Sequence, residues 1–371
     1  MLSLMRQKRQ KKVVVAMSGG VDSSVAVALL KERGYEVIGL TMDIFDIPKE
    51  LSGEKSLCSH CGPRSQIEAI RVADHLGIPI HVVDLKKFFR DTVIHYFCEE
   101  YKKGRTPNPC IRCNWFIKFE ALWRRARNLG ADFMATGHHA RVVLDQKSGR
   151  YFLLKGKDIE KDQSYFLHAL TQEQLSRTLL PVGDFAKKDV RKIARQLGLD
   201  VQQRSESQEI CFIPDNNYIR FLKQMIPEAF RAGPIVDTEG RVLGRHKGVL
   251  HFTIGQRRGM GVAASHPLYV LEIHTEDNKI VVGPSDKLYK KKVCVSQVNL
   301  IMIEKLISPL PVQAKIRYKH PEAKAVLIPL EKNQARLDFE RPQRAVAPGQ
   351  SAVFYDGDVV VGGGIIESAG D

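Results

Sequence analysis

The sequence predicts an α/β protein in which a doubly wound, Rossmann-like parallel sheet is followed by a small central β-rich domain and a C-terminal β-barrel. In the first 140 residues, short apolar runs alternate with segments of helical periodicity, as in a parallel sheet covered by helices. Beyond Pro214, short strand-like runs separated by Gly, Pro, Asp or Asn continue to the end, which is typical of small barrels. A chain of 371 residues has room for two or three domains, and we place them at 1–213, 214–291 and 292–371.

Apolar periodicity divides the first domain into strands and helices. Strands are expected at Val13–Met17, Glu36–Met42, Ile78–Leu85 and Asp132–Ala135, and helices directly after Gly20 and over Gln66–Leu76 and Lys86–Tyr101. A hairpin over Ala140–Lys155 and helical segments over 163–197 complete this domain. A doubly wound sheet binds its ligand at the carboxyl ends of its strands, and the candidate ends are Met17, Met42 and Thr136.

The β-rich part is expected to contain strands at regular intervals. They are Lys279–Val282, Val293–Val298, Val312–Tyr318, Ala323–Pro329 and Ser351–Tyr355. Their spacing fits one or two small β-barrels.

The composition excludes several classes of protein. With 57 Lys and Arg against 42 Asp and Glu, the formal net charge is +15, and 43% of the residues are hydrophobic. This hydrophobic share argues against disorder, and the longest apolar runs fall far short of the roughly 20 residues of a membrane span. The N-terminal segment puts its apolar residues before its basic ones, the reverse of a secretory signal. We therefore expect a cytoplasmic protein with no membrane association, and the charge makes nucleic acid the leading partner.

A glycine-containing loop, Ser18-Gly19-Gly20-Val21-Asp22-Ser23-Ser24, lies between the first strand and the first helix. Two glycines let the backbone turn tightly, and the helix N-terminus adds partial positive charge where an anion would sit. The alternative is a plain turn into a helix capped by Asp22 or Ser23. The Lys of the Walker loop is absent, which excludes the common NTPases.

The loop also matches the SGGVDSS signature of the ATP pyrophosphatases, enzymes that adenylate a substrate and release pyrophosphate. This resemblance implies an ATP site with magnesium. It would be formed by Ala16, Met17, Ser18, Gly19, Gly20, Val21, Asp22 and Ser23, with Met42 and Gly137 lining the adenine and ribose.

Seven cysteines are too few for a disulfide scaffold and point to reactivity or metal ligation. Cys110 and Cys113 follow Thr106-Pro107-Asn108-Pro109, which we expect to be a stiff loop because its prolines disfavour helix. A helix starting near Asn114 would place Cys113 at its N-terminus and lower the pKa of its thiol. The position of Cys211 between Ile210 and Phe212 by itself favours a buried apolar residue over a reactive thiol.

The four remaining cysteines suggest other roles. Cys58 and Cys61 could join the first pair in a zinc site, but the 48 residues between the two pairs exceed the ~15 to 20 usual in such sites. Cys98 and Cys294 are expected to be packing residues.

A basic stretch surrounds Cys110 and Cys113. Between Lys102 and Asn128 there are eight basic residues and one acidic residue, Glu120. Three aromatic residues, Trp115, Phe119 and Trp123, recur at i, i+4 and i+8, and this spacing is more often a core face than a base-stacking platform. We therefore interpret the aromatics as packing and the charges as contacts to a phosphate backbone.

Over nearly its whole length, the sequence resembles the bacterial tRNA 2-thiouridylase family. The matching motifs are SGGVDSS, GRTPNPCIRCNWFIKF, ATGHHAR, KDQSYFL, SQEICFIP, GVLHFTIGQRRGMG and PGQSAVFYDGDVVVGGG, in the family's order. The resemblance implies ATP-dependent adenylation of the carbon-2 oxygen of the wobble uridine in tRNA. Sulfur from a cysteine persulfide would then replace that oxygen, giving 2-thiouridine, AMP and pyrophosphate.

The resemblance also implies roles for individual residues and partners. Cys211 would hold the persulfide and Cys113 would be the partner nucleophile, while Asn108, Pro109 and Cys110 would border the flipped base. Contacts to tRNA would come from His138, Lys161, Asp162, Gln163, Arg317, Tyr318 and Gln350. The implied partners are the anticodon arm of tRNAs for lysine, glutamate and glutamine, and a sulfur-donor protein, which would be a cysteine desulfurase or a relay protein.

One position departs from the family pattern, because many members have Asp where this chain has Cys110. Three thiolates, Cys110, Cys113 and Cys211, could instead hold an iron-sulfur cluster with one open iron for exogenous sulfide. Two other functions stay open. An ATP pyrophosphatase acting on a small molecule would leave the cysteines and the basic C-terminal part without a role, and an RNA-binding module with a vestigial loop would leave the intact Ser and Asp residues of that loop unexplained.

Overall fold

The computed structural model describes residues 9–44, 63–199, 210–213 and 215–371, and its contacts divide the chain into two compact units. The first unit comprises Met1–Phe89, Asn114–Ser164 and Thr171–Pro214, and the second comprises Arg90–Cys113, Tyr165–Leu170 and Asp215–Asp371. The rival zinc ligands Cys58 and Cys61 lie outside the described residues. Within the described ranges, no helix is long and apolar enough to cross a membrane.

The first unit contains the predicted parallel sheet, with strand order β3-β2-β1-β4-β7. Its strands are β1 Lys12–Ala16, β2 Glu36–Asp43, β3 Ile80–Asp84, β4 Phe133–Ala135 and β7 Thr178–Leu179, and neighbouring strands run parallel. The first four strands confirm the sequence predictions. Since β2 and β4 flank β1 on opposite sides, the strand order reverses at β1, which is where a doubly wound sheet binds its ligand.

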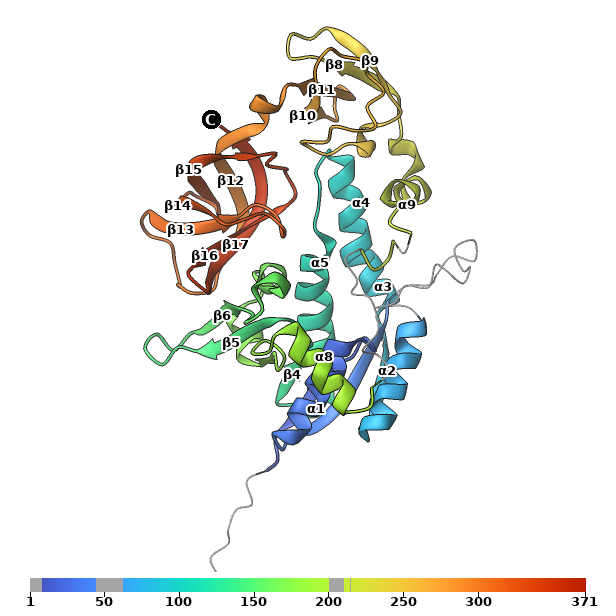
Figure 1. The fold of residues 1–371 in the computed structure, drawn as a ribbon, viewed down its shortest axis with the longest axis vertical. Helices are drawn as coiled ribbons and strands as arrows, with labels where there is room; N and C mark the ends of the chain where they lie inside the picture. Colours follow the sequence, from blue (N-terminus) through green and yellow to red (C-terminus); the bar gives the residue numbers. More distant parts are fainter. Residues whose placement is uncertain (1–8, 45–62, 200–209, 214) are drawn as a thin grey trace, which may run out of the picture. The chain divides into compact units, whose positions relative to one another are not determined.

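Helices α1 Val21–Glu32, α2 Pro63–Leu76 and α8 Lys187–Gln196 cover this sheet (Figure 1). The apolar face of α1, with Val25 and Leu30, packs against Val13 and Val15 of β1, and Val190 of α8 joins the same core. Because β1 contributes an almost continuous apolar run, it is buried on both faces, as expected of a central parallel strand.

Two long helical stretches each contain a π-helical segment. The first comprises α3 Lys86–Phe89, η2 Arg90–Ile94 and α4 His95–Lys102, and the second comprises α5 Pro109–Arg112, η3 Cys113–Ala121 and α6 Leu122–Asn128. The first confirms the helix predicted over Lys86–Tyr101.

The predicted start of the second helix was wrong. It begins at Pro109, with Asn108 as its N-cap. Proline is favoured at the first helical position because the amide hydrogen that it lacks has no partner there. The helix therefore begins five residues before the expected Asn114, and Cys113 lies one turn inside it.

The segment over 163–197 contains helical segments, as predicted, but they are short and a strand interrupts them. After the hairpin of β5 Ala140–Leu144 and β6 Tyr151–Lys155, which is confirmed, the chain forms the short 3-10 helices η4 Ile159–Lys161 and η5 Ser164–Leu167. Helix α7 Gln172–Ser176, strand β7 and helix α8 follow. Strand β7 has only two residues, which is too short for the periodicity of the sequence to distinguish it from a helix.

The second unit is rich in β-structure, as predicted. Its four-stranded sheet has the order β10-β11-β8-β9, formed by β8 Gly233–Val236, β9 Val242–His246, β10 Tyr269–His274 and β11 Lys279–Gly283. A closed six-stranded barrel follows, in the order β12-β15-β14-β13-β16-β17 with β12 paired to β17. Its strands are β12 Tyr289–Leu300, β13 Leu310–Lys315, β14 Ala323–Pro329, β15 Ala335–Arg344, β16 Ser351–Asp356 and β17 Val359–Gly370.

One helix of this unit was not predicted, namely α9 Tyr218–Met225, which is capped by the Asn217 side chain. It packs on α4 through two ring contacts, in which Tyr218 stacks on Tyr101 at 5.2 Å and Phe221 meets Phe97 edge-on at 6.2 Å (Figure 1). The apolar face of α9 is short, and the residues that follow Pro214 have the composition of strands, so the sequence pattern did not predict this helix.

Candidate active site

The loop after β1 has the geometry of an anion site. Gly19 adopts φ +68°, and a Cβ there would lie 2.7 Å from Cβ of Glu68, so only glycine fits. Gly20 is the N-cap of α1, and no side chain among the described residues caps this helix. The predicted alternative of a cap by Asp22 or Ser23 is therefore wrong, and the first-turn amides of α1 face the place where an anion would be stabilised.

Hydroxyl groups hold the loop in shape. The hydroxyls of Ser23 and Ser24 both donate to the carbonyl oxygen of Gly20, at 3.1 and 2.9 Å, and the amide of Ser18 donates to Oγ of Ser23 at 3.3 Å. Ser23 and Ser24 are buried. These serines therefore fix the backbone whose amides would meet a phosphate.

Asp22 is the acidic residue of the loop, and two basic side chains converge on it. Nζ of Lys187 donates to Oδ1 at 2.7 Å and to Oδ2 at 2.6 Å, and Nε2 of His139 donates to Oδ1 at 3.0 Å. Burial raises the pKa of Asp22, but the hydrogen bond from His139 and the positive charge of Lys187 outweigh it and hold the pKa below its usual 3.8. Asp22 is therefore ionised at neutral pH.

Lys187 and His139 are functional candidates that sequence reasoning missed. Lys187 is the first residue of α8, and the carboxylate of Asp158 accepts a hydrogen bond from its amide at 2.9 Å. Its side chain is only 11% exposed. From the sequence, a lysine at the start of an amphipathic helix is expected to be exposed to solvent. Only the packing of α8 on α1 shows that Lys187 points toward Asp22.

The turn after β4 passes directly behind the loop. A Cβ on Gly137 would lie 2.6 Å from the backbone of both Asp22 and Ser23, so the absence of a side chain permits this close approach. Met42, at the end of β2, is buried, and its carbonyl accepts a hydrogen bond from Gln66 at 3.3 Å. The structure thus brings Gly137 to the predicted ATP loop and places Met42 at the neighbouring strand end.

The predicted base-binding residues lie in the second unit, at the start of α5. Oδ1 of Asn108 accepts from the amide of Cys110 at 3.1 Å, and Pro109 occupies the first helical turn. Cys113 follows one turn later and is 8% exposed, so Cys110 and Cys113 share one side of the helix at i and i+3.

The barrel holds the segment that precedes this helix. Nε2 of Gln350 donates to the carbonyl of Thr106 at 2.8 Å, and the amide of Thr106 donates to the carbonyl of Pro348 at 2.8 Å. Arg105 lies beside it, with Nε 2.6 Å from Glu100 and a second ion pair to Glu367. Gln350, which was expected to contact tRNA, thus contacts the backbone two residues before Asn108 in this structure.

Cys211 lies in the first unit, in the short described segment 210–213, where its neighbour Phe212 contacts Phe89 edge-on at 5.7 Å. Cys98 is buried as expected, and burial raises the pKa of its thiol to about 11. Cys294 lies in β12 as expected. Among the described residues, no group of three His, Cys, Asp or Glu side chains could hold a metal ion.

The remaining predicted tRNA contacts in the first unit are mostly enclosed. His138 is 9% exposed, bonds Thr136 at 2.7 Å, and has its pKa lowered well below 6.5, first by burial and then by Lys118. Asp162 is buried and accepts from the amides of Gly156 and Ser164, both at 3.0 Å. Gln163 accepts from the amide of His139 at 2.9 Å, and Lys161 is half-buried.

Two other predicted contacts lie on the barrel. Arg317 is exposed, and the ring of Tyr318 lies 4.4 Å from that of Phe166. Both belong to the second unit, as does Gln350.

Comparison with known proteins agrees with this architecture. Three family models match along the chain: "tRNA methyl transferase HUP domain" at residues 11–215, "tRNA methyl transferase PRC-barrel domain" at 219–284 and "Aminomethyltransferase beta-barrel domain" at 290–366. A curated relative from Halothermothrix orenii, named tRNA-specific 2-thiouridylase MnmA, is 50% identical over 96% of this chain and 99% of its own. The chain belongs to the tRNA-specific 2-thiouridylase family.

Other members of this family are comparably similar. The protein of the same name from Acetivibrio thermocellus is 49% identical over 96% of this chain and 99% of its own, and that from Clostridioides difficile is 46% identical over 97% and 99%. Since these relatives match from end to end, the family resemblance includes both β-rich parts as well as the parallel sheet.

Proposed function

We propose that this chain is an ATP-dependent tRNA sulfurtransferase that makes 2-thiouridine at the wobble position. The observation that carries this proposal is its identity of 46 to 50% to tRNA-specific 2-thiouridylases over nearly the full length of both chains. The loop between β1 and α1, with its uncapped helix N-terminus, supports an ATP-binding role. The formal charge of +15 suits a polyanionic substrate.

In the first step, the carbon-2 oxygen of the uridine attacks the α-phosphorus of ATP and pyrophosphate leaves. The amides at the start of α1 would stabilise the phosphates, and Ala16, Met17, Ser18 and Val21 would line the nucleotide with Met42 and Gly137. Lys187 would add a positive charge beside the leaving pyrophosphate, because its ammonium group lies at the loop in contact with Asp22.

Magnesium does not fit the protein groups of this loop as they stand. Both carboxylate oxygens of Asp22 already accept hydrogen bonds from Lys187, whereas magnesium prefers carboxylate oxygens that are open to it. We therefore expect the ion to arrive with the phosphates of ATP.

In the second step, the terminal sulfur of a Cys211 persulfide attacks carbon 2 of the uridine, and AMP leaves with the oxygen. The Cys113 thiolate then attacks Sγ of Cys211, which breaks the sulfur–sulfur bond, leaves the outer sulfur on carbon 2 and forms a Cys113–Cys211 disulfide. A thiol reductant must reduce that disulfide before a sulfur-donor protein, a cysteine desulfurase or a relay protein, reloads Cys211.

The substrate is the anticodon arm of tRNA, which places the reaction in the cytoplasm. Asn108, Pro109 and Cys110 would receive the flipped uridine, and the turn that they form is preset by the Asn108 cap. We expect the tRNAs for lysine, glutamate and glutamine as substrates. Contacts outside the target base would come from His138, Lys161, Asp162, Gln163, Arg317, Tyr318 and Gln350, of which Arg317 is exposed.

An iron-sulfur route is the second candidate, since Cys110 and Cys113 lie one turn apart on one helix. Anaerobic purification followed by iron analysis and a visible spectrum separates the two routes. A colourless, iron-free protein that thiolates tRNA excludes the cluster, whereas stoichiometric iron lost together with activity excludes the persulfide route.

The test of the proposed function is pyrophosphate release from ATP with and without tRNA. We expect release to depend on tRNA, and Cys113→Ser and Cys211→Ser each to abolish thiolation while tRNA binding stays nearly unchanged. Release that responds to a small molecule but not to tRNA would indicate another ATP pyrophosphatase. A chain that binds tRNA without consuming ATP would be an RNA-binding module.

A further inference from the structure

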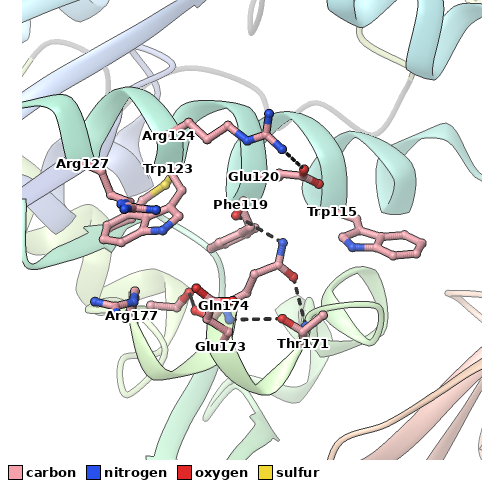
Figure 2. Close-up of a pocket in the computed structure, with 12 residues that line it drawn as sticks. Trp115, Phe119, Glu120, Trp123, Arg124, Arg127, Thr171, Glu173, Gln174 and Arg177 are labelled. Atoms are coloured by element: carbon pink, nitrogen blue, oxygen red, sulfur yellow. Dashed lines mark hydrogen bonds and ion pairs between the residues drawn. The ribbon is translucent and has the colours of Figure 1, made fainter.

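A cavity of about 280 Å³ lies in the first unit, away from the ATP loop residues. Its walls come from the helical stretch 113–128 and from α7 with its flanking residues, as Figure 2 shows. Trp115, Phe119 and Trp123 project from the longer helix, and Gln174 and Arg177 face them from the other wall. None of these residues belongs to the proposed reaction site.

The three aromatic residues do not form the core face that their spacing predicted. Phe119 is 2% exposed, but Trp115 and Trp123 remain half-exposed and line the cavity. They are the chain's two tryptophans. Phe119 and Met134 are buried below them, so the cavity has an apolar floor and an indole ring at each side.

Hydrogen bonds fix the shape of the opposite wall. Gln174 and Thr171 form a capping box at the start of α7, with distances of 3.0 and 3.2 Å. Nε2 of Gln174 also donates to the carbonyl of Phe119 at 3.2 Å, which fastens α7 to the longer helix. The two walls are therefore held together before any ligand binds, which lowers the entropic cost of binding.

Arginine side chains line the cavity beside the indoles. The guanidinium of Arg177 lies 5.5 Å from the centre of the Trp123 ring, and Arg127 is exposed at the rim. Glu120 lies at the same rim, but Arg124 binds it at 2.6 Å. With Glu173 included, the lining carries three arginines and two glutamates, a net charge of +1.

We propose that this cavity binds an unpaired nucleotide of the tRNA substrate, outside the target uridine. The base would stack on an indole ring and the phosphate would meet Arg127 and Arg177, since single-stranded nucleic acid is bound by stacking platforms flanked by cations. The excess of positive groups favours RNA over an acidic peptide, which presents no base to stack. The inference rests on the proposed function, because it takes tRNA as the ligand.

Tryptophan fluorescence tests this proposal directly, because the two tryptophans of the chain, Trp115 and Trp123, both line the cavity. An unmodified tRNA transcript is titrated into the full chain without ATP, while filter binding measures the affinity independently. We expect quenching that saturates with the filter-binding curve. Trp123→Ala should weaken binding about 5- to 150-fold, in line with roughly 1–3 kcal/mol per stacked base, and Trp123→Phe should restore most of the affinity.

Arg177→Gln tests the charge and leaves the indole in place. It should lower affinity and reduce the slope of log K against log salt by about 0.7. Arg33→Gln, an exposed arginine at the end of α1, is the matched control and should change neither. Circular dichroism confirms that each variant is folded.

The possible failures are distinct. If tRNA binds by filter assay without quenching, or if Trp123→Ala and Arg177→Gln keep full affinity, the cavity does not bind RNA, while the proposed function stands. Quenching by a purified sulfur-donor protein but not by tRNA would make the cavity a protein docking site and also overturn the inference. A chain that binds no tRNA at all defeats both the inference and the proposed function.

Discussion

The ammonium group of Lys187 lies 2.6 Å from Oδ2 and 2.7 Å from Oδ1 of Asp22, so the first residue of α8 is joined to the loop that follows β1. These residues are 165 positions apart in the chain. The lysine side chain is only 11% exposed and that of Asp22 is 29% exposed, so solvent screens this pair less than a pair on the surface. The contact gives the loop a positive group that its own sequence lacks.

Replacing Lys187 should therefore impair adenylation. We expect Lys187→Met to lower tRNA-dependent pyrophosphate release by about 100-fold, since one positioned charge at a developing anion is worth a factor of roughly 10² to 10³. Filter binding of tRNA should change little. Lys188→Met, at the exposed neighbouring position, is the control, and equal losses in the two variants would refute a specific role for Lys187.

Gly137 should tolerate no side chain. In Gly137→Ala the new Cβ would lie 2.6 Å from the backbone of Asp22 and Ser23, which must then shift. We expect ATP affinity, measured by equilibrium dialysis, to fall at least about tenfold. Gly370→Ala, where a Cβ meets nothing within 4 Å, should bind ATP normally. Normal ATP binding by Gly137→Ala would show that this turn does not border the nucleotide.

Gln350 should hold the segment before the base-binding turn. Its side-chain amide donates to the carbonyl of Thr106 at 2.8 Å, so Gln350→Ala should speed hydrogen exchange of the backbone amides of Thr106, Asn108 and Cys110 in the absence of tRNA. The loss of one such bond corresponds to about 1 kcal/mol, or about fivefold faster exchange. If Gln350→Ala leaves the hydrogen-exchange rates of these amides unchanged but lowers the affinity for tRNA, Gln350 acts only by contacting tRNA.

His168 should make the stability of the fold depend on pH. It is 3% exposed, neither ring nitrogen has a hydrogen-bond partner among the described residues, and burial lowers its pKa to about 4. The unfolded chain, with a histidine pKa of about 6.5, binds the proton first as the pH falls, so stability is lost between about pH 6.5 and 4. At pH 5 this loss amounts to about 2 kcal/mol.

His168→Leu should remove that part of the pH dependence. Urea unfolding at pH 7.5 and pH 5 measures it, and the difference between the two pH values should be smaller in the variant by about 2 kcal/mol. His266→Leu, at an exposed histidine, should leave the difference as it is. An unchanged difference in His168→Leu would mean that this ring is accessible to protons in the folded chain.

The parallel sheet and the barrel were predictable because their signals are local. The apolar run of Val13–Met17 and the glycines after it specify a buried strand and a tight turn wherever the rest of the chain lies. The glycine-containing loop after β1 could be located in the same way. Helix α9 and strand β7 were missed, since each is too short for its periodicity to outweigh the surrounding pattern.

The residues that complete the site could not be predicted, because they depend on packing between distant segments. Lys187 resembles any solvated lysine in the sequence, and only the contact of α8 with α1 turns it toward Asp22. The start of α5 differs from the prediction for another reason, because a proline predicts a helix break, whereas Pro109 is a first-turn residue. Likewise, the tryptophan spacing predicted a shared helix face but not that α7 would leave a cavity against it.

The most direct test of the central claim is the product itself. The purified chain is incubated with an unmodified lysine tRNA transcript, ATP, a sulfur-donor protein and a thiol reductant, and the digested nucleosides are analysed by mass spectrometry together with AMP and pyrophosphate. The account predicts 2-thiouridine at the wobble position, with one AMP and one pyrophosphate released for each sulfur incorporated. Absence of 2-thiouridine, or its formation without ATP consumption, would contradict it.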